Sequence, residues 1–339
     1  MIVNVVYGEM SDERWLAHAK RLNPRAALTV AMPFLRLHIA SGRVSQWGMA
    51  AYQVNALSLS ADRKLVAYAG SGGEVGVLRV ASREPVFEKR RRGEHWSCAL
   101  TPSGARLYLG DKDGIGVLDP RTGAFTRFVL TGKPGALAIS PDGKLLAASS
   151  WESPLRVFDT TTQRVVWEVP DIVGEPAFSP DGRSLAVANA LMVRKAWVGR
   201  LACYDAANGR VRWTARLGSG RSASFAWALD GSRLLGAASV DDGASEVAWY
   251  AAADGARDAL PWTGAVEAVA VSPSGTRLGV CADSTVAILD DAGKELARGT
   301  GTQESLTSLA FANDRTLLAA GRDVNSGPAI LQLRLGASR

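Results

Sequence analysis

The sequence predicts an all-β protein: a seven-bladed β-propeller with four-stranded antiparallel blades, closed by strands from the N- and C-terminal ends of the chain. The main observation is a repeat. An alternating apolar strand, a Ser-Pro-Asp-Gly-like turn and a second apolar strand occur together seven times. Composition agrees, because 35 glycines and 47% hydrophobic residues in 339 suit many short strands joined by tight turns around a large core.

The seven copies are regularly spaced along the chain. The residue at the start of the turn is Ser60 in the first copy and Ala312 in the last, so 252 residues contain six steps, which average 42. Propeller blades of four strands repeat at about this period, whereas helical repeats of about 33–34 residues are shorter. The intervening turns start at Thr101, Ser140, Ser179, Ala228 and Ser272.

Each unit also carries a second hairpin pattern, in which a polar turn joins two alternating strands, as in residues 155–167 and 201–213. Two hairpins make four strands. The Pro-Asp-Gly turn closes a hairpin readily, because Pro fixes φ at the first turn position and Gly accepts a positive φ. One such sheet cannot bury both of its faces, so we expect the sheets to pack side by side around an axis.

Closure of the ring requires both ends of the chain. The seventh unit supplies strands near residues 306–311, 316–320 and 329–335, and residues 43–47 are expected to add the missing outer strand. Residues 35–39 predict one strand more than seven four-stranded blades require. A five-stranded closing blade and a displaced C-terminal strand both accommodate it.

The domain boundaries follow from the repeat. We expect one propeller domain over residues 35–339, preceded by a leader over residues 1–34. Residues 11–22 of the leader predict a short helix, since Ser11 can cap it, acids occupy its first turn and bases its last.

The cysteines, histidines and apolar runs of the sequence argue against several classes of protein. Cys98, Cys203 and Cys281 lie far apart in apolar runs and predict buried free thiols, not a disulfide framework or a zinc site. The three histidines accompany no nucleophile motif, so we expect no catalytic residues, no cofactor and no metal. The first ten residues are unlike a signal peptide, and no apolar run approaches the roughly 18 residues of a membrane span. We therefore expect a cytoplasmic protein with no membrane partner.

Residues 140–147 and 179–186 match a Ser-Pro-Asp-Gly turn followed by a Leu-containing apolar strand. In these residues the chain resembles the WD40-like and YVTN-type β-propeller repeat proteins. No copy has the Gly-His and Trp-Asp pairs of true WD40 units, so their buried hydrogen-bond network is not expected. Residues 204–213 are also similar, over one blade, to quinoprotein-type propeller repeats.

Loops carry the function of a propeller, because its strands are used in the stack. Three segments belong to the two loop classes that emerge at one end of the ring: a basic run beside an aromatic residue, a Trp in a polar loop, and a long hairpin in the fourth unit, residues 189–200. Each has a plainer interpretation, as a solvated charge run, a loop contact or a hairpin folded onto the ring. The candidate partner-binding residues are Lys89, Arg90, Arg91, Arg92, Trp96, Trp151, Leu191, Met192, Arg194, Lys195 and Trp197.

These features favour a non-enzymatic propeller that serves as a scaffold or sensor module and binds another protein. Two alternatives remain open at this point. The net charge of +6 and the basic loops are compatible with binding nucleic acid or another polyanion. The quinoprotein-like segment would suit an enzyme or cofactor binder. Nucleic acid ranks below protein, because the bases form no long stripe with interleaved aromatics.

Overall fold

The computed structural model describes residues 32–38, 43–50 and most of 54–334. The expected helix over residues 11–22 lies outside the described residues. Within the last range the description omits residues 71, 83, 92, 130–132, 151–152, 171, 173, 194–195, 220–222, 239–244, 263, 265, 283–284, 301–304 and 324–326.

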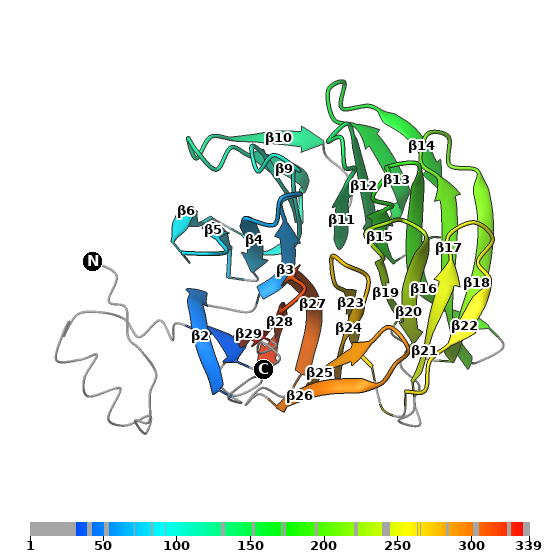
Figure 1. The fold of residues 1–339 in the computed structure, drawn as a ribbon. Coiled ribbons are helices and arrows are strands. Elements are labelled where there is room, and N and C mark those ends of the chain that lie inside the picture. Colours follow the sequence, from blue (N-terminus) through cyan, green and yellow to red (C-terminus); the bar gives the residue numbers. More distant parts are fainter. Residues whose placement is uncertain are drawn as a thin grey trace.

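Six four-stranded sheets surround a common centre, and in each the strands are hydrogen-bonded in sequence order from the inner edge outward (Figure 1). All pairings within these six blades are antiparallel. The first three blades consist of β3 (Val54–Leu59), β4 (Leu65–Gly70), β5 (Glu74–Arg79) and β6 (Pro85–Arg90); of β7 (His95–Leu100), β8 (Leu107–Asp111), β9 (Gly114–Leu118) and β10 (Phe125–Val129); and of β11 (Ala136–Ile139), β12 (Leu145–Ser150), β13 (Ser153–Asp159) and β14 (Val165–Val169).

The next three blades consist of β15 (Glu175–Phe178), β16 (Ser184–Val193), β17 (Ala196–Asp205) and β18 (Val211–Ser219); of β19 (Ala223–Trp227), β20 (Arg233–Ala238), β21 (Glu246–Ala251) and β22 (Arg257–Ala259); and of β23 (Ala268–Val271), β24 (Arg277–Ala282), β25 (Thr285–Asp290) and β26 (Glu295–Thr300).

The remaining sheet closes the ring and differs from the others. Its order is β2 (Arg43–Ala50), β1 (Met32–His38), β29 (Gly327–Arg334), β28 (Thr316–Asp323) and β27 (Ser305–Asn313). Strand β1 runs parallel to β29, with Phe34 opposite Ile330 and Leu37 opposite Leu333. The two ends of the chain therefore meet inside this one sheet, which we call the closing sheet.

The structure corrects the predicted blade count. Six four-stranded antiparallel blades are present among the described residues, not seven, because the seventh repeat does not form a sheet of that kind. Its three strands are joined by two strands from the N-terminal side, one of them in parallel. The expected outer strand is present as β2, but β1 lies between it and β29, so the surplus strand near residues 35–39 is a fifth member of the closing sheet.

The recurrent turn holds its shape through its own side chains. Ser140 Oγ donates to Asp142 Oδ1 at 2.6 Å and accepts from the backbone N–H of Leu145 at 2.9 Å. Gly143 supplies the positive φ of 74° that the turn requires. The same set of contacts recurs at Ser179, so the Ser-Pro-Asp-Gly phrase is explained by local geometry.

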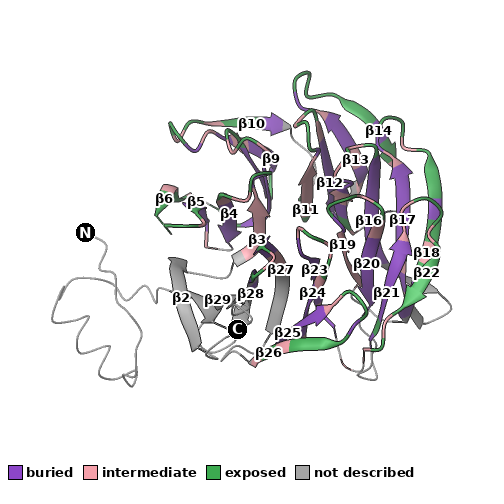
Figure 2. Cartoon of the chain, viewed as in Figure 1, coloured by how far each residue is buried: buried purple, intermediate pink, exposed green. Residues whose placement is uncertain are grey.

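Burial follows position within a blade (Figure 2). The middle strands are buried along most of their length on both faces, as in β4 and β8, because a neighbouring blade covers each face. The outer strands β6 and β22 are largely exposed. The three cysteines are unpaired and buried, as predicted, and burial raises the pKa of the Cys98 and Cys281 thiols to about 12.

Tryptophans on the outer part of the ring tie neighbouring blades together. Trp167 of β14 donates from Nε1 to the carbonyl of Ala206 in the next blade at 2.8 Å, and its ring lies against Gly209. Trp213 of β18 repeats this contact one blade further on, donating to Ala252 at 2.9 Å. We call this contact the tryptophan bridge. Both residues therefore pack between blades.

Replacing Trp213 by Ala should lower the free energy of unfolding by about 3–5 kcal/mol, because a 7% exposed indole is removed from between two blades. Trp213→Phe is the matched control. It keeps most of the buried ring and loses the hydrogen bond, which is worth about 1 kcal/mol. Urea unfolding of both variants measures the difference. A loss below about 1 kcal/mol for Trp213→Ala would show that the bridge is not a stabilising contact.

A chain starting at residue 51 should melt well below a chain starting at residue 32, because only the shorter chain lacks β1 and β2. We expect a decrease of roughly 10 °C or more in a single transition, given that 1 kcal/mol shifts the Tm by about 2–4 °C in domains of 150–250 residues. Differential scanning calorimetry of the two truncations checks this. Equal melting temperatures would show that the ring is sealed without the N-terminal strands.

Candidate functional site

The strand order divides the ring into two faces. Blade-to-blade connections and the turns between second and third strands emerge at one end, which we call the connection face. The other two turns of each blade emerge at the opposite end, the turn face. Residues 89–91 and the described part of residues 189–200 belong to segments of the connection face. Their role in binding is a separate question.

The basic run at the end of β6 is anchored in part by its own blade. Lys89 and Arg90 are exposed, and Arg92 lies outside the described residues. Arg90 Nε donates to the carbonyl of Gly72 at 2.8 Å and lies 3.6 Å from Oε1 of the buried Glu74. The Arg91 guanidinium lies 3.8 Å from the centre of the Phe125 ring. Arg90 and Arg91 are therefore positioned side chains, not a freely solvated run.

A buried histidine follows this run. His95 is 1% exposed, and neither ring nitrogen has a hydrogen-bond partner. Desolvation lowers the pKa of its imidazole, the nearby Arg91 and Arg127 lower it further, and Asp111 opposes them. Asp111 itself accepts two hydrogen bonds from Arg127 Nη1, at 2.9 and 3.1 Å, and a third from the backbone N–H of Asp113 at 2.9 Å. The neutral imidazole is thus favoured in the folded protein.

The long hairpin predicted in the fourth unit is present. Strands β16 and β17 pair continuously from Ser184 opposite Asp205 to Val193 opposite Ala196, and each has ten residues where most strands have about half as many. Leu191, Met192 and Trp197 lie in these strands, and Met192 is opposite Trp197 in the register. The tip residues Arg194 and Lys195, like Trp151 in the turn between β12 and β13, lie outside the described residues.

A cavity of about 360 Å³ occupies the middle of the ring and is lined by residues at or near the inner strands of every blade and of the closing sheet. Half-buried Trp96 lines it, with Nε1 donating to Glu94 Oε2 at 3.2 Å. Two carboxylates, Glu175 and Glu267, line it as well. Glu175 is exposed to the cavity, and the protein around it raises the pKa of its carboxyl group by desolvation. We call this the channel site.

The structure brings Trp96 to the channel site, whereas Lys89 and Arg90 lie on β6, the outermost strand of the β3–β6 blade. Sequence reasoning missed Asn55, Glu175 and Glu267. A signal was available: each stands four or five residues before the Ser of its repeated turn, where inner strands begin. Polar residues at that register position face a central opening, while the rest of each inner strand packs between blades.

The comparisons with known proteins agree with the fold. No family model matches the chain. An uncharacterized WD repeat-containing protein of Synechocystis sp. is 24% identical over 178 residues, which are 49% of this chain and 49% of that protein, so the chain spans about half the length of the curated relative it matches. The hydrazine synthase of Kuenenia stuttgartiensis is structurally similar, with a TM-score of 0.70, 18% identity and cover of 84% of this chain and 96% of that one.

At 18% identity this likeness shows a shared fold alone. Together with the blades described above, the comparisons confirm the predicted resemblance to WD40-like propeller repeats. Within the described part of the chain, no helix is long and apolar enough to cross a bilayer. No group of three or more His, Cys, Asp and Glu residues there is arranged to hold a metal ion.

The buried His95 predicts a pH-dependent stability. Its folded-state pKa lies below the unfolded value of about 6.5, so the unfolded chain binds the additional proton and stability falls as the pH drops through about 6.5. For one proton the slope is at most about 1.4 kcal/mol per pH unit. His95→Gln should flatten the fall between about pH 7 and 5, measured by urea unfolding at each pH. An unchanged slope would assign the fall to other groups.

Proposed function

We propose that this chain is a non-catalytic β-propeller that binds another protein at its connection face and thereby acts as a scaffold or sensor module. The observation that carries the proposal is the channel site, where Trp96 is half-exposed at an opening lined by Glu175 and Glu267. Partly exposed tryptophans are frequent anchors of protein interfaces, because they bury much apolar area at low entropic cost.

The charges of the channel site suggest the partner's chemistry. Glu175 and Glu267 favour a Lys or Arg side chain inserted from the partner, and they disfavour phosphate. Lys89 and Arg90 lie on β6, the outermost strand of its blade, so they would meet acidic residues only at the outer margin of the contact. A protein loop can present both kinds of charge, whereas a nucleic acid presents negative charge alone. These features support protein over nucleic acid.

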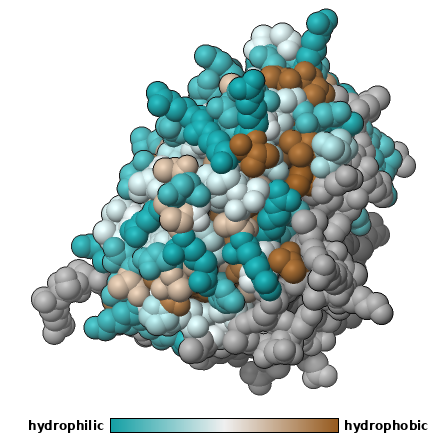
Figure 3. Space-filling view, turned by 90° about the vertical axis from the view of Figure 1, so that its right-hand side faces the viewer, coloured by the Kyte–Doolittle hydropathy of each residue, from teal (hydrophilic) through white to brown (hydrophobic). Residues whose placement is uncertain are grey.

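The outer side of the ring is a poorer candidate. The side seen in Figure 3 carries small, separate apolar areas among hydrophilic side chains. Exposed apolar residues on outer strands include Val165, Val166 and Val211, and single exposed residues of this kind are common on monomeric proteins. Unpaired cysteines further support action in the cytoplasm, since thiols stay reduced there.

The test is a comparative capture experiment with the immobilised full chain. Proteins captured from a lysate of the source cells, with and without nuclease, are quantified on the wild type and on Trp96→Ala, Glu267→Gln and Leu229→Ala. Leu229 is an exposed apolar residue in the turn between β19 and β20, on the opposite face, and serves as the matched control. Circular dichroism verifies that each variant is folded.

We expect one or more proteins to be retained by the wild type and Leu229→Ala and depleted at least about tenfold on Trp96→Ala, because a central aromatic is worth about 2 kcal/mol or more. Titration of the purified partner should show a smaller loss for Glu267→Gln. Equal capture by all four proteins would contradict the proposal, and capture abolished by nuclease would favour nucleic acid.

A further inference from the structure

The tryptophan bridge is absent at the boundary between the β7–β10 and β11–β14 blades. Trp213 is opposite Cys203, which stands two residues before the turn residue Asp205, and it rests on Gly255 of the next blade. In the β7–β10 blade the corresponding residue is Thr126, opposite Val117, and the receiving position in the β11–β14 blade is Gln163, with φ of 60°. At this boundary, therefore, neither the tryptophan of the bridge nor the glycine that receives it is present.

Neither replacement restores the contact. Thr126 has no ring that could lie on the next blade, and its neighbour Arg127 binds Asp111 with Nη1 at 2.9 Å. At Gly209 and Gly255 a Cβ atom would lie only 2.7 Å from the tryptophan ring that rests there. Gln163 carries such a Cβ atom, so its position could not receive a ring as those glycines do.

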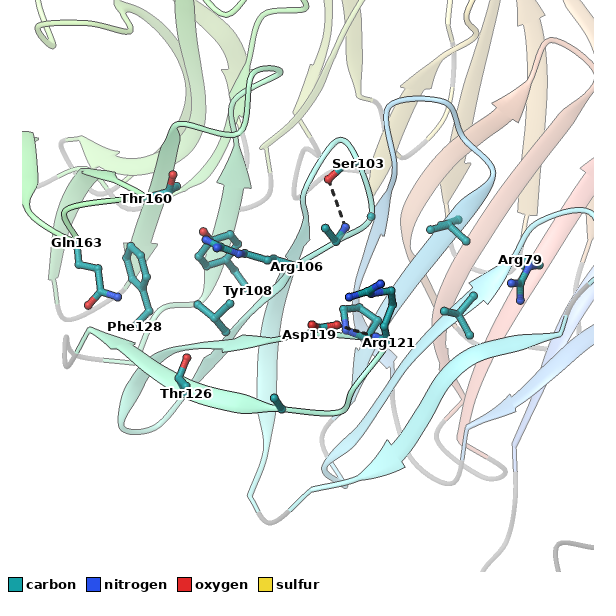
Figure 4. A pocket seen from close by; sticks show the side chains of 17 residues that line it. Arg79, Ser103, Arg106, Tyr108, Asp119, Arg121, Thr126, Phe128, Thr160 and Gln163 are labelled. Carbon is teal, nitrogen blue, oxygen red and sulfur yellow. Dashed lines mark hydrogen bonds between the residues drawn. The ribbon is translucent and has the colours of Figure 1, made fainter.

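A groove of about 800 Å³ opens at this place on the turn face (Figure 4). Thr126 and Phe128 of β10 line one part, and Thr160 and Gln163 from the turn of the next blade line another. Buried aromatic side chains form part of its lining: Tyr108 meets Phe128 edge-on with ring centres 5.4 Å apart, and Phe128 meets Phe158 at 6.1 Å. These contacts give the groove a rigid apolar side.

The charged residues of the lining are mainly basic. Arg79, Arg106 and Arg121 are exposed along the groove, and none of the ion pairs recorded between described residues includes them. Asp119 is the single acid in the lining. Its Oδ1 accepts the backbone N–H groups of Arg121 and Thr122 at 2.8 and 3.3 Å, so it is occupied in holding its own turn.

We propose that this groove binds an acidic peptide segment of a partner protein that also carries an aromatic residue. Carboxylates of the segment pair with Arg79, Arg106 and Arg121, whose guanidinium groups suit carboxylate geometry. The aromatic ring rests near Phe128, in the inter-blade space that Trp167 and Trp213 fill at the next two boundaries. The groove is on the face opposite the channel site, so this inference does not rest on the proposed function.

The probes are synthetic peptides titrated against the full chain by fluorescence anisotropy. One pool is rich in Asp and Glu with a fixed central Trp, a second has Ala in place of that Trp, and a third has Lys in place of the acids. We expect saturable binding of the first pool, at least about tenfold weaker binding of the second, and none of the third.

Three variants locate the binding. The double variant Arg106→Gln/Arg121→Gln should bind the first pool at least about tenfold more weakly than the wild type. Arg210 is an exposed arginine in another turn on the same face, and Arg210→Gln should change the affinity for that pool less than about twofold. Thr126→Trp, which fills the groove, should abolish binding and leave the Tm unchanged or higher.

Equal binding of the Trp and Ala pools would overturn the proposal in favour of simple polyanion binding. An effect of Arg210→Gln as large as that of the double variant, or no saturable binding of the first pool, would overturn it as well. Because these peptides are titrated directly, failure here leaves the capture experiment on Trp96 unaffected.

Discussion

Packing of one blade against the next is the interaction on which the rest of the structure depends. Apolar clusters join each blade to both neighbours, as in the cluster that contains Leu155 and Val157 of β13 with Leu185 and Val187 of β16. A single sheet would leave one face in water, so no blade is expected to be stable alone. Stability is therefore a property of the closed ring, so the closing sheet contributes to the stability of every blade and not only to that of its own five strands.

Departures from the repeat mark the places where the ring is open to other molecules. Where Trp167 and Trp213 bridge blades, the space between outer strands is filled. Where Thr126 and Gln163 stand instead, a groove remains. Likewise, inner strands that begin with Asn55, Trp96 or Glu267 leave polar side chains at the central cavity. A repeat protein of this kind keeps its core uniform and varies the residues at edges and turns.

The two openings differ in charge, which separates their chemistry. The channel site is lined by Glu175 and Glu267, whereas the groove on the turn face is lined by three arginines and a single acid. A partner suited to one opening is therefore poorly suited to the other. The two openings share no lining residue, so the two proposed contacts would not compete for the same side chains.

The sequence by itself determined the all-β class, the repeat, the two hairpins per unit and the buried cysteines, because turn geometry and strand alternation are local and leave a local record. It also identified Trp96 and the long hairpin of β16 and β17. Only the tertiary structure decided that β1 enters the closing sheet parallel to β29, that Glu175 and Glu267 share a cavity, and that Thr126 leaves a groove unfilled. These features join residues far apart in the chain, and no local pattern specifies which blades meet or how the ends pair.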